Sequence, residues 1–235
     1  MQFGRLNLVN LSPIALNGRT AESIEWQMEE QVYLPTFTYS LMRTNILTLC
    51  LDAEQAGLRS SIIEGCPPAI LNEQQGVASE AVSSSDLQGR FHDELSPLDA
   101  DQRTAVLNCI LTQNYQLVYG VPGSGKTTSI VVLLRILAKL RKRVLVVSLT
   151  HYSIDNVLLR LQATGFNDFV RVTRNVESVH EDIQSNVYSA HELDTMDKIR
   201  QVFEENFIYA TICHQMNNQL LANVKFDYVV IDESA

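Results

Sequence analysis

The stretch YGVPGSGKTT in the middle of the chain carries the pattern G-x-x-x-x-G-K-[ST]. Glycines at Gly120, Gly123 and Gly125 let the backbone curl tightly and point amide N–H groups at phosphate oxygens. Lys126 adds a point charge for the outer phosphates, and the hydroxyl of Thr127 is a ligand for Mg²⁺. The pattern predicts a loop that binds ATP with Mg²⁺. We expect contacts to the nucleotide from Gly120, Gly123, Ser124, Gly125, Lys126, Thr127 and Thr128.

Two neighbouring acids follow the last apolar run of the chain, FDYVVIDESA. Asp232 ends that run, where an acid can hold the Mg²⁺ shell, and Glu233 comes next, where it can orient and deprotonate the attacking water. We therefore expect Thr127 and Asp232 to hold the metal, with Lys126 and Glu233 as catalytic residues. Adjacent Asp and Glu are typical of ATP hydrolysis coupled to motion. The alternative is a pair of solvated acids at a strand end.

Gln102, in the segment LDADQRTAV upstream of the loop, has two interpretations. Asp99 as an N-cap with Gln102 three residues later forms a capping box, which stabilises the start of a helix. An amide side chain can also pair with the edge of adenine through two hydrogen bonds. Both roles can hold at once, and we expect Gln102 to belong to the ATP site.

Strand and helix patterns alternate after Pro97. Strands are expected at YQLVYG, RVLVVSL, FVRVT, IYATI and FDYVVID, and helices at TTSIVVLLRILAKL, HYSIDNVLLRLQATG, around 177–188 and at 194–205. Such alternation predicts a parallel sheet in an α/β layer fold. Before Pro97, residues 1–35 suggest small strands, and residues 38–63 suggest a helix with a broad buried face. Residues 71–97 lack large apolar groups and predict a linker or mobile loop.

Composition narrows the possible functions. The 235 residues carry a formal net charge of −9, which gives no general warrant for nucleic-acid binding. The four cysteines form no CxxC pair, so zinc or iron–sulfur ligation is not expected, and reduced thiols fit an intracellular protein. No segment has the length and apolarity of a membrane span. The first twenty residues contain two Arg and no acid, a faint resemblance to an organellar transit peptide.

Taken together, the motifs resemble those of superfamily 1 helicases and run in the expected order: Gln102 in LDADQRTAV, GVPGSGKTT, VLVVSLTHYSIDNVL, ATIC and VVIDESA. The THYSIDN piece is most similar to the branch that contains the replication helicase/nuclease of Okazaki-fragment processing and the nonsense-mediated-decay RNA helicases. TYSLMRTNILTLCL and LRSSIIEGCPPAIL resemble the helical stalk of the replication enzyme. The resemblance implies a P-loop NTPase fold of the RecA-like kind, a parallel sheet with flanking helices, preceded by a small β segment and a helical stalk.

The resemblance also implies a domain plan and a function. It places a partial β-rich segment at 1–35, a stalk at 36–70, a linker at 71–97 and the first RecA-like domain at 98–235. It implies an ATP-dependent 5′-to-3′ DNA helicase of replication and repair that couples hydrolysis to translocation on single-stranded DNA. Single-stranded nucleic acid would contact Thr150, His151, Ser153 and Thr211. The implied partners are the rest of a helicase/nuclease chain or a replication/repair complex, in the nucleus or else the mitochondrion.

The sequence ends at Ala235, where the family places a second RecA-like domain with arginine fingers. We therefore expect a fragment or truncated product that has little activity alone. Two alternatives stay open: an RNA helicase of the nonsense-mediated-decay type, and a truncated non-catalytic module that binds ATP or nucleic acid. The stalk-like segment favours DNA over RNA.

Overall fold

The computed structural model describes residues 36–68, 83–188, 196–216, 218–222 and 224–233. The chain divides into two units, Met1–Arg43 and Thr44–Ala235, and the second contains every motif that could do chemistry. The expected β-rich segment at 1–35 lies outside the described residues. None of the helices in the described ranges is long and apolar enough to cross a membrane.

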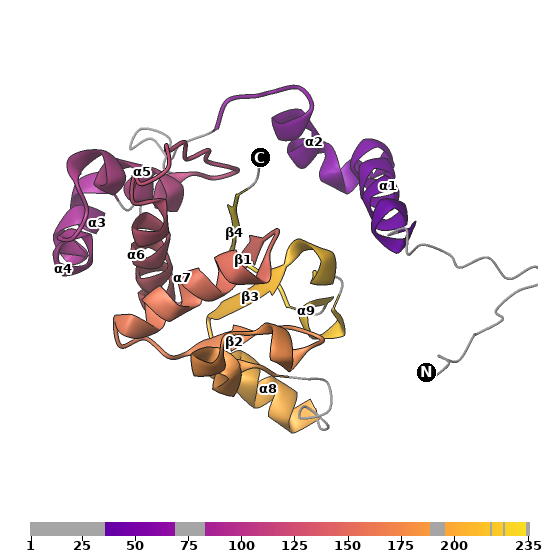
Figure 1. Cartoon of the computed structure of the whole chain (residues 1–235). Helices are drawn as coiled ribbons and strands as arrows, with labels where there is room; N and C mark the ends of the chain where they lie inside the picture. The colour runs from indigo at the N-terminus through magenta and orange to yellow at the C-terminus, as the bar shows by residue number, and fades with distance from the viewer. Residues whose placement is uncertain (1–35, 69–82, 189–195, 217, 223, 234–235) are drawn as a thin grey trace, which may run out of the picture. The chain divides into compact units, whose positions relative to one another are not determined.

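A four-stranded, wholly parallel sheet organises the described part of the second unit (Figure 1). Its strands are β1 (Val144–Ser148), β2 (Phe169–Arg171), β3 (Ile208–Ile212) and β4 (Tyr228–Asp232), in the order β2-β3-β1-β4. β1 and β3 are buried along their whole length, as expected for parallel strands covered on both faces. In the register, Ser148 lies opposite both Ile212 and Asp232, so the carboxyl ends of three strands meet at one edge.

Helices cover both faces of the sheet. On one face the core joins the sheet to α5 (Ala100–Leu111), α6 (Lys126–Lys139) and α7 (His151–Ala163). On the other face a smaller cluster contains Val202 of α8 (Met196–Glu205) and Leu221 of α9 (Gln219–Ala222). This arrangement confirms the predicted α/β fold with a parallel sheet and flanking helices.

The expected strand at residues 115–120 is not formed. The segment pairs with no strand of the described sheet, which ends at β4. Leu117 and Tyr119 are 76% and 95% exposed. An apolar run becomes a strand only beside a neighbour that takes its backbone hydrogen bonds, and the described residues supply none here.

The prediction of a linker or mobile loop at residues 71–97 was wrong over part of that range. Residues Ser84–Arg90 form α3 and residues His92–Leu95 form α4. Leu87, Phe91 and Leu95 are buried in the main core, and their four-residue spacing puts them on one helical stripe. The prediction overlooked this stripe because the average apolar content of the region is low.

The expected helix at 38–63 is interrupted, and its apolar face is not buried. α1 (Thr36–Leu51) ends before Asp52, whose carboxylate accepts the N–H of Glu54 to start the 3-10 helix η3 (Ala53–Gln55) before α2 (Ala56–Ile62). Ile46 is 61% exposed. Short 3-10 helices, η4 (Val176–Ser178) and η5 (Glu181–Asn186), replace the helix expected around 177–188, and η6 (Cys213–Gln215) follows β3.

Candidate nucleotide site and nucleic-acid interface

The phosphate loop has the tight backbone that its glycines predict. Gly123 and Gly125 have φ angles of 83° and 78°, in the left-handed region where other residues are strained. A Cβ atom on Gly120 would lie 2.5 Å from the Oγ of Ser124, and one on Gly125 would lie 2.6 Å from the Nε2 of Gln102. Gly125 is the N-cap of α6, so the free N–H groups of that helix begin where the loop ends.

The side chain of Lys126 folds back onto the backbone of its own loop. Its Nζ donates to the backbone oxygens of Gly120 at 2.5 Å and of Val121 at 3.1 Å. Phosphate oxygens carry full negative charge and form stronger hydrogen bonds with an ammonium group than these carbonyls do. The lysine is therefore in place to exchange loop carbonyls for the phosphates of a nucleotide. Thr127 and Thr128 are half-buried in the first turn of α6.

The acid pair lies at the end of β4. Burial raises the pKa of Asp232, the negative charge of Glu233 adds to the effect, and Lys126 opposes it. Glu233 has a φ angle of 55°, a left-handed conformation that is costly for a residue with a Cβ.

A buried hydroxyl beside this pair fits a cation. Ser148 and Asp232 are register partners in parallel strands, so their side chains project from the same face of the sheet. The Oγ of Ser148 is buried and has no hydrogen-bond partner among the described residues. A partly desolvated carboxylate next to an unpaired hydroxyl is a suitable environment for hydrated Mg²⁺, which prefers oxygen ligands and keeps several waters.

One cleft brings the loop and the acids together. It has a volume of about 650 Å³ and lies between β4, the segment 115–120, the phosphate loop and α5. Lys126, Asp232 and Glu233 all line it. From the predicted loop residues, Gly120 and Lys126 thus share one cavity with both acids, although they are far apart in the sequence.

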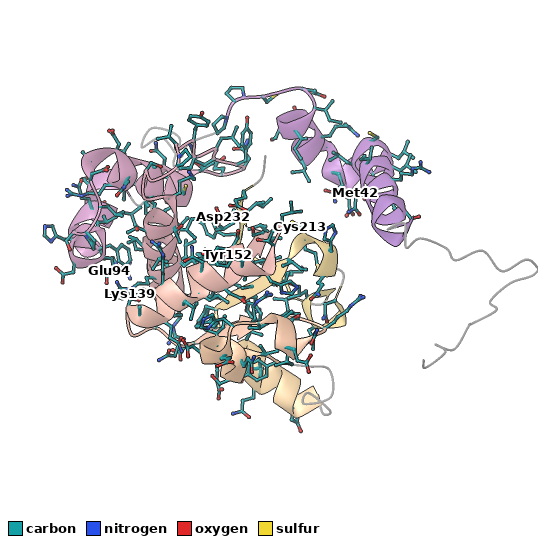
Figure 2. The ribbon with its side chains drawn as sticks, viewed as in Figure 1. Met42, Glu94, Lys139, Tyr152, Cys213 and Asp232 are labelled. Carbon is teal, nitrogen blue, oxygen red and sulfur yellow. The ribbon has the colours of Figure 1, made fainter. Side chains whose placement is uncertain are left out.

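The start of α7 reaches the same acids. Thr150 is the N-cap, and its Oγ1 accepts the N–H of Ser153 at 3.2 Å. The Oγ of Ser153 donates to the Oε2 of Glu233 at 2.9 Å. In Figure 2, the labelled Tyr152 precedes Ser153 at the start of α7, and the labelled Asp232 precedes Glu233 at the end of β4. The predicted nucleic-acid residues thus adjoin the predicted catalytic base.

A buried ion pair fixes α7 to the sheet. Arg171, on β2, is fully buried, and its Nε donates to the Oδ1 of Asp155 at 3.1 Å. The Nη2 of Arg171 lies 2.9 Å from the Nδ1 of His151. Burial and the nearby positive charge of Arg171 lower the pKa of His151, which favours the neutral imidazole.

Two side chains depart from the sequence-based assignment of nucleic-acid contacts. Thr211 is fully buried, and its Oγ1 donates to the backbone oxygen of Val172 at 3.1 Å. Its hydroxyl is therefore withdrawn from the surface, and we no longer expect it to touch nucleic acid. Tyr152, which the sequence analysis did not single out, is 81% exposed at the start of α7.

Comparison with known proteins agrees with the motifs. Residues 97–201 match the family model described as an AAA domain. The chain is 29% identical over 209 residues to the DNA replication ATP-dependent helicase/nuclease JHS1 of Arabidopsis thaliana, covering 89% of this chain and 15% of that relative. It is 30% identical over 186 residues to the DNA replication ATP-dependent helicase/nuclease DNA2 of Gallus gallus, with 76% and 18% covered. The chain thus spans less than a fifth of the length of these curated relatives. The chain is similar to the DNA replication ATP-dependent helicase/nucleases, and its residues 97–201 match the model of an AAA domain.

Proposed function

We propose that this chain is the ATP-binding motor module of a DNA helicase of replication or repair, and that ATP hydrolysis drives movement along single-stranded DNA. A 5′-to-3′ direction is part of the proposal and follows from the family resemblance. One observation carries it: a single cleft contains Lys126, Asp232 and Glu233, and the start of α7 touches the last of these.

The residues of the predicted ATP site have complementary roles in this proposal. The loop amides and Lys126 hold the phosphates of ATP, while the Thr127 hydroxyl and Asp232 hold Mg²⁺. The bound cation supplies charge neutralisation on the phosphate oxygens. Glu233 accepts the proton of the attacking water.

The beginning of α7 supplies the nucleic-acid contacts. Thr150 and His151 are short polar groups suited to the sugar–phosphate backbone, which carries no base information. The exposed ring of Tyr152 offers a stacking surface for one base. The net charge of −9 argues against binding through bulk electrostatics, so these local contacts carry the affinity.

The partners and the cellular location are proposed from the same family resemblance. We propose that the module works with the rest of a helicase/nuclease chain or with a replication/repair complex, and that its place of action is the nucleus.

No arginine is among the described residues that line the cleft. Since an arginine finger contributes about 10³–10⁵ in rate in related NTPases, the 235-residue chain alone should hydrolyse ATP very slowly.

Binding of labelled oligonucleotides tests the proposal. Fluorescence anisotropy at one fixed salt concentration compares oligo-dT with oligo-rU of equal length, with and without a non-hydrolysable Mg·ATP analogue. We expect oligo-dT to bind more tightly and its affinity to change with the nucleotide. A preference for oligo-rU would favour an RNA helicase, and loss of all nucleic-acid binding would contradict the proposed function.

A matched pair of variants locates the interface. Tyr152→Ala should weaken oligo-dT binding by about 1–3 kcal/mol, the usual value of one stacked base. Tyr152→Phe keeps the aromatic face and should bind as the unmodified chain does. Equal binding by all three proteins would remove Tyr152 from the interface.

A further inference from the structure

Three side chains form a hydrogen-bond chain that ends on the predicted catalytic base. Thr150 Oγ1 lies 3.1 Å from Ser153 Oγ and donates to it, and Ser153 Oγ donates to Glu233 Oε2 at 2.9 Å. Thr150 Oγ1 also accepts the backbone N–H of Ser153. This chain of hydrogen bonds therefore links the exposed N-cap of α7 to the end of β4.

The direction of this chain follows from its proton count. A hydroxyl has one proton to donate, and a carboxylate only accepts. Ser153 therefore uses its proton on Glu233 and must accept from Thr150, whose own proton is then also in use. A backbone phosphate is likewise only an acceptor. It can accept from these two hydroxyls only by taking the proton that Thr150 now donates to Ser153 and the proton that Ser153 now donates to Glu233.

Burial and neighbouring contacts hold these three hydrogen-bonded side chains in place. Ser153 is only 9% exposed, whereas Thr150 is exposed to solvent. Two residues after Ser153, the buried Asp155–Arg171 pair fixes α7 to β2. Glu233 itself has a left-handed backbone, so its position is costly and is maintained by its contacts. A carboxylate and a phosphate also compete for the same positive helix N-terminus.

We propose that Ser153 is a positioning residue that holds Glu233 at the start of α7 until single-stranded nucleic acid displaces it. Binding of the strand then releases the general base toward the phosphate loop. The inference rests on the proposed function, since it needs a nucleic-acid strand at α7. It adds the group that couples that strand to the ATP site.

Reciprocity gives a test that does not depend on ATP hydrolysis. If the strand and Glu233 compete for Ser153, removing Glu233 must strengthen strand binding by the coupling factor. Oligo-dT affinity is measured by anisotropy, without nucleotide, for the 235-residue chain and for Ser153→Ala, Glu233→Ala and the double variant. We expect Glu233→Ala to bind about fivefold more tightly than the unmodified chain. In the Ser153→Ala background the same change should give no gain.

Control variants separate positioning from simple charge repulsion. Ser153→Thr keeps the hydroxyl, so Glu233→Ala should again strengthen binding in that background. Glu204→Ala removes one exposed carboxylate elsewhere and should leave affinity unchanged. Circular dichroism and urea unfolding establish that each variant is folded.

The outcomes are distinct. An equal gain from Glu233→Ala with and without Ser153 would mean that charge alone acts, and the inference would be overturned. Absence of any gain would overturn it too, while leaving the proposed function intact. If the unmodified chain bound no oligonucleotide, the proposed function would fail and this inference with it.

Discussion

Gln102 on α5 is bonded to the phosphate loop: its Nε2 donates to the backbone oxygen of Ser124 at 2.9 Å. Its Oε1 accepts the N–H of Asp99 at 3.2 Å, and the Asp99 carboxylate accepts the N–H of Gln102 at 2.8 Å. The capping box predicted from the sequence is therefore present. Because both amide atoms of Gln102 already bind protein, we now favour a role in shaping the loop over a role in reading adenine.

Two substitutions of Gln102 separate these roles. Gln102→Ala removes the side-chain half of the capping box and the contact to the loop, so the free energy of unfolding should fall by about 1 kcal/mol. Gln102→Glu keeps an acceptor for Asp99 but cannot donate to Ser124, so it should unfold nearly as the unmodified chain does. Both variants should bind ATP and GTP more weakly by the same factor. Urea unfolding and titration with fluorescent nucleotides measure these effects, and a loss confined to ATP would restore the adenine-reading role.

The buried pair of Asp155 and Arg171 should be a major contributor to stability. Asp155→Ala leaves the fully buried guanidinium of Arg171 without its carboxylate, and we expect a loss of about 3–5 kcal/mol in the free energy of unfolding. Asp168→Ala makes the same change at an exposed position and should alter stability by less than about 0.5 kcal/mol. Similar losses in the two variants would show that the pair is not specially important.

Glu94 on α4 forms an ion pair with Lys139 at the end of α6, and Figure 2 shows the two side chains together. The hydrogen bond from Lys139 is the main cause of the lowered pKa of Glu94. A lowered pKa means that the pair stabilises the fold above the usual carboxyl pKa of 4.5, and that this contribution is lost as the pH falls through the lower, folded value.

Glu94→Gln should therefore destabilise the protein at pH 7 but not in acid. Because Lys139 is half exposed and solvent screens the pair, we expect a loss of only about 0.5–1 kcal/mol at pH 7. The difference from the unmodified chain should shrink as the pH falls below 4.5. Urea unfolding at a series of pH values measures it, and a difference that grew in acid would contradict the assignment.

Local patterns were sufficient to predict the centre of the fold. β1, β3 and β4 are short apolar runs, and α6 and α7 have helical periodicity with recognisable starts at Gly125 and Thr150. The phosphate loop and the acid pair could be singled out for a similar reason, because the chemistry expected of them depends on residue type at fixed spacing, and their roles stay predictions.

Features that depend on distant contacts were not predictable. Whether residues 115–120 form a strand depends on a neighbour in the sheet, which their own pattern does not specify. The burial of Thr211 depends on its place at the end of the central strand β3, where Val172 accepts its hydroxyl. The contact of Ser153 with Glu233 joins residues 80 positions apart, and no local signal marks it. Each of these misses concerns tertiary pairing rather than propensity.

The most direct test of the account is equilibrium binding of Mg·ATP to the 235-residue chain and to Lys126→Ala, by calorimetry or a fluorescent analogue. Lys225→Ala is the matched control, because it removes the same charge from an exposed position outside the cleft. We predict that the unmodified chain and Lys225→Ala bind Mg·ATP equally, and that Lys126→Ala loses binding by more than about tenfold, a difference of about 1.4 kcal/mol. Equal affinity of Lys126→Ala and the unmodified chain would contradict the assignment of the phosphate loop, and with it the proposed motor function.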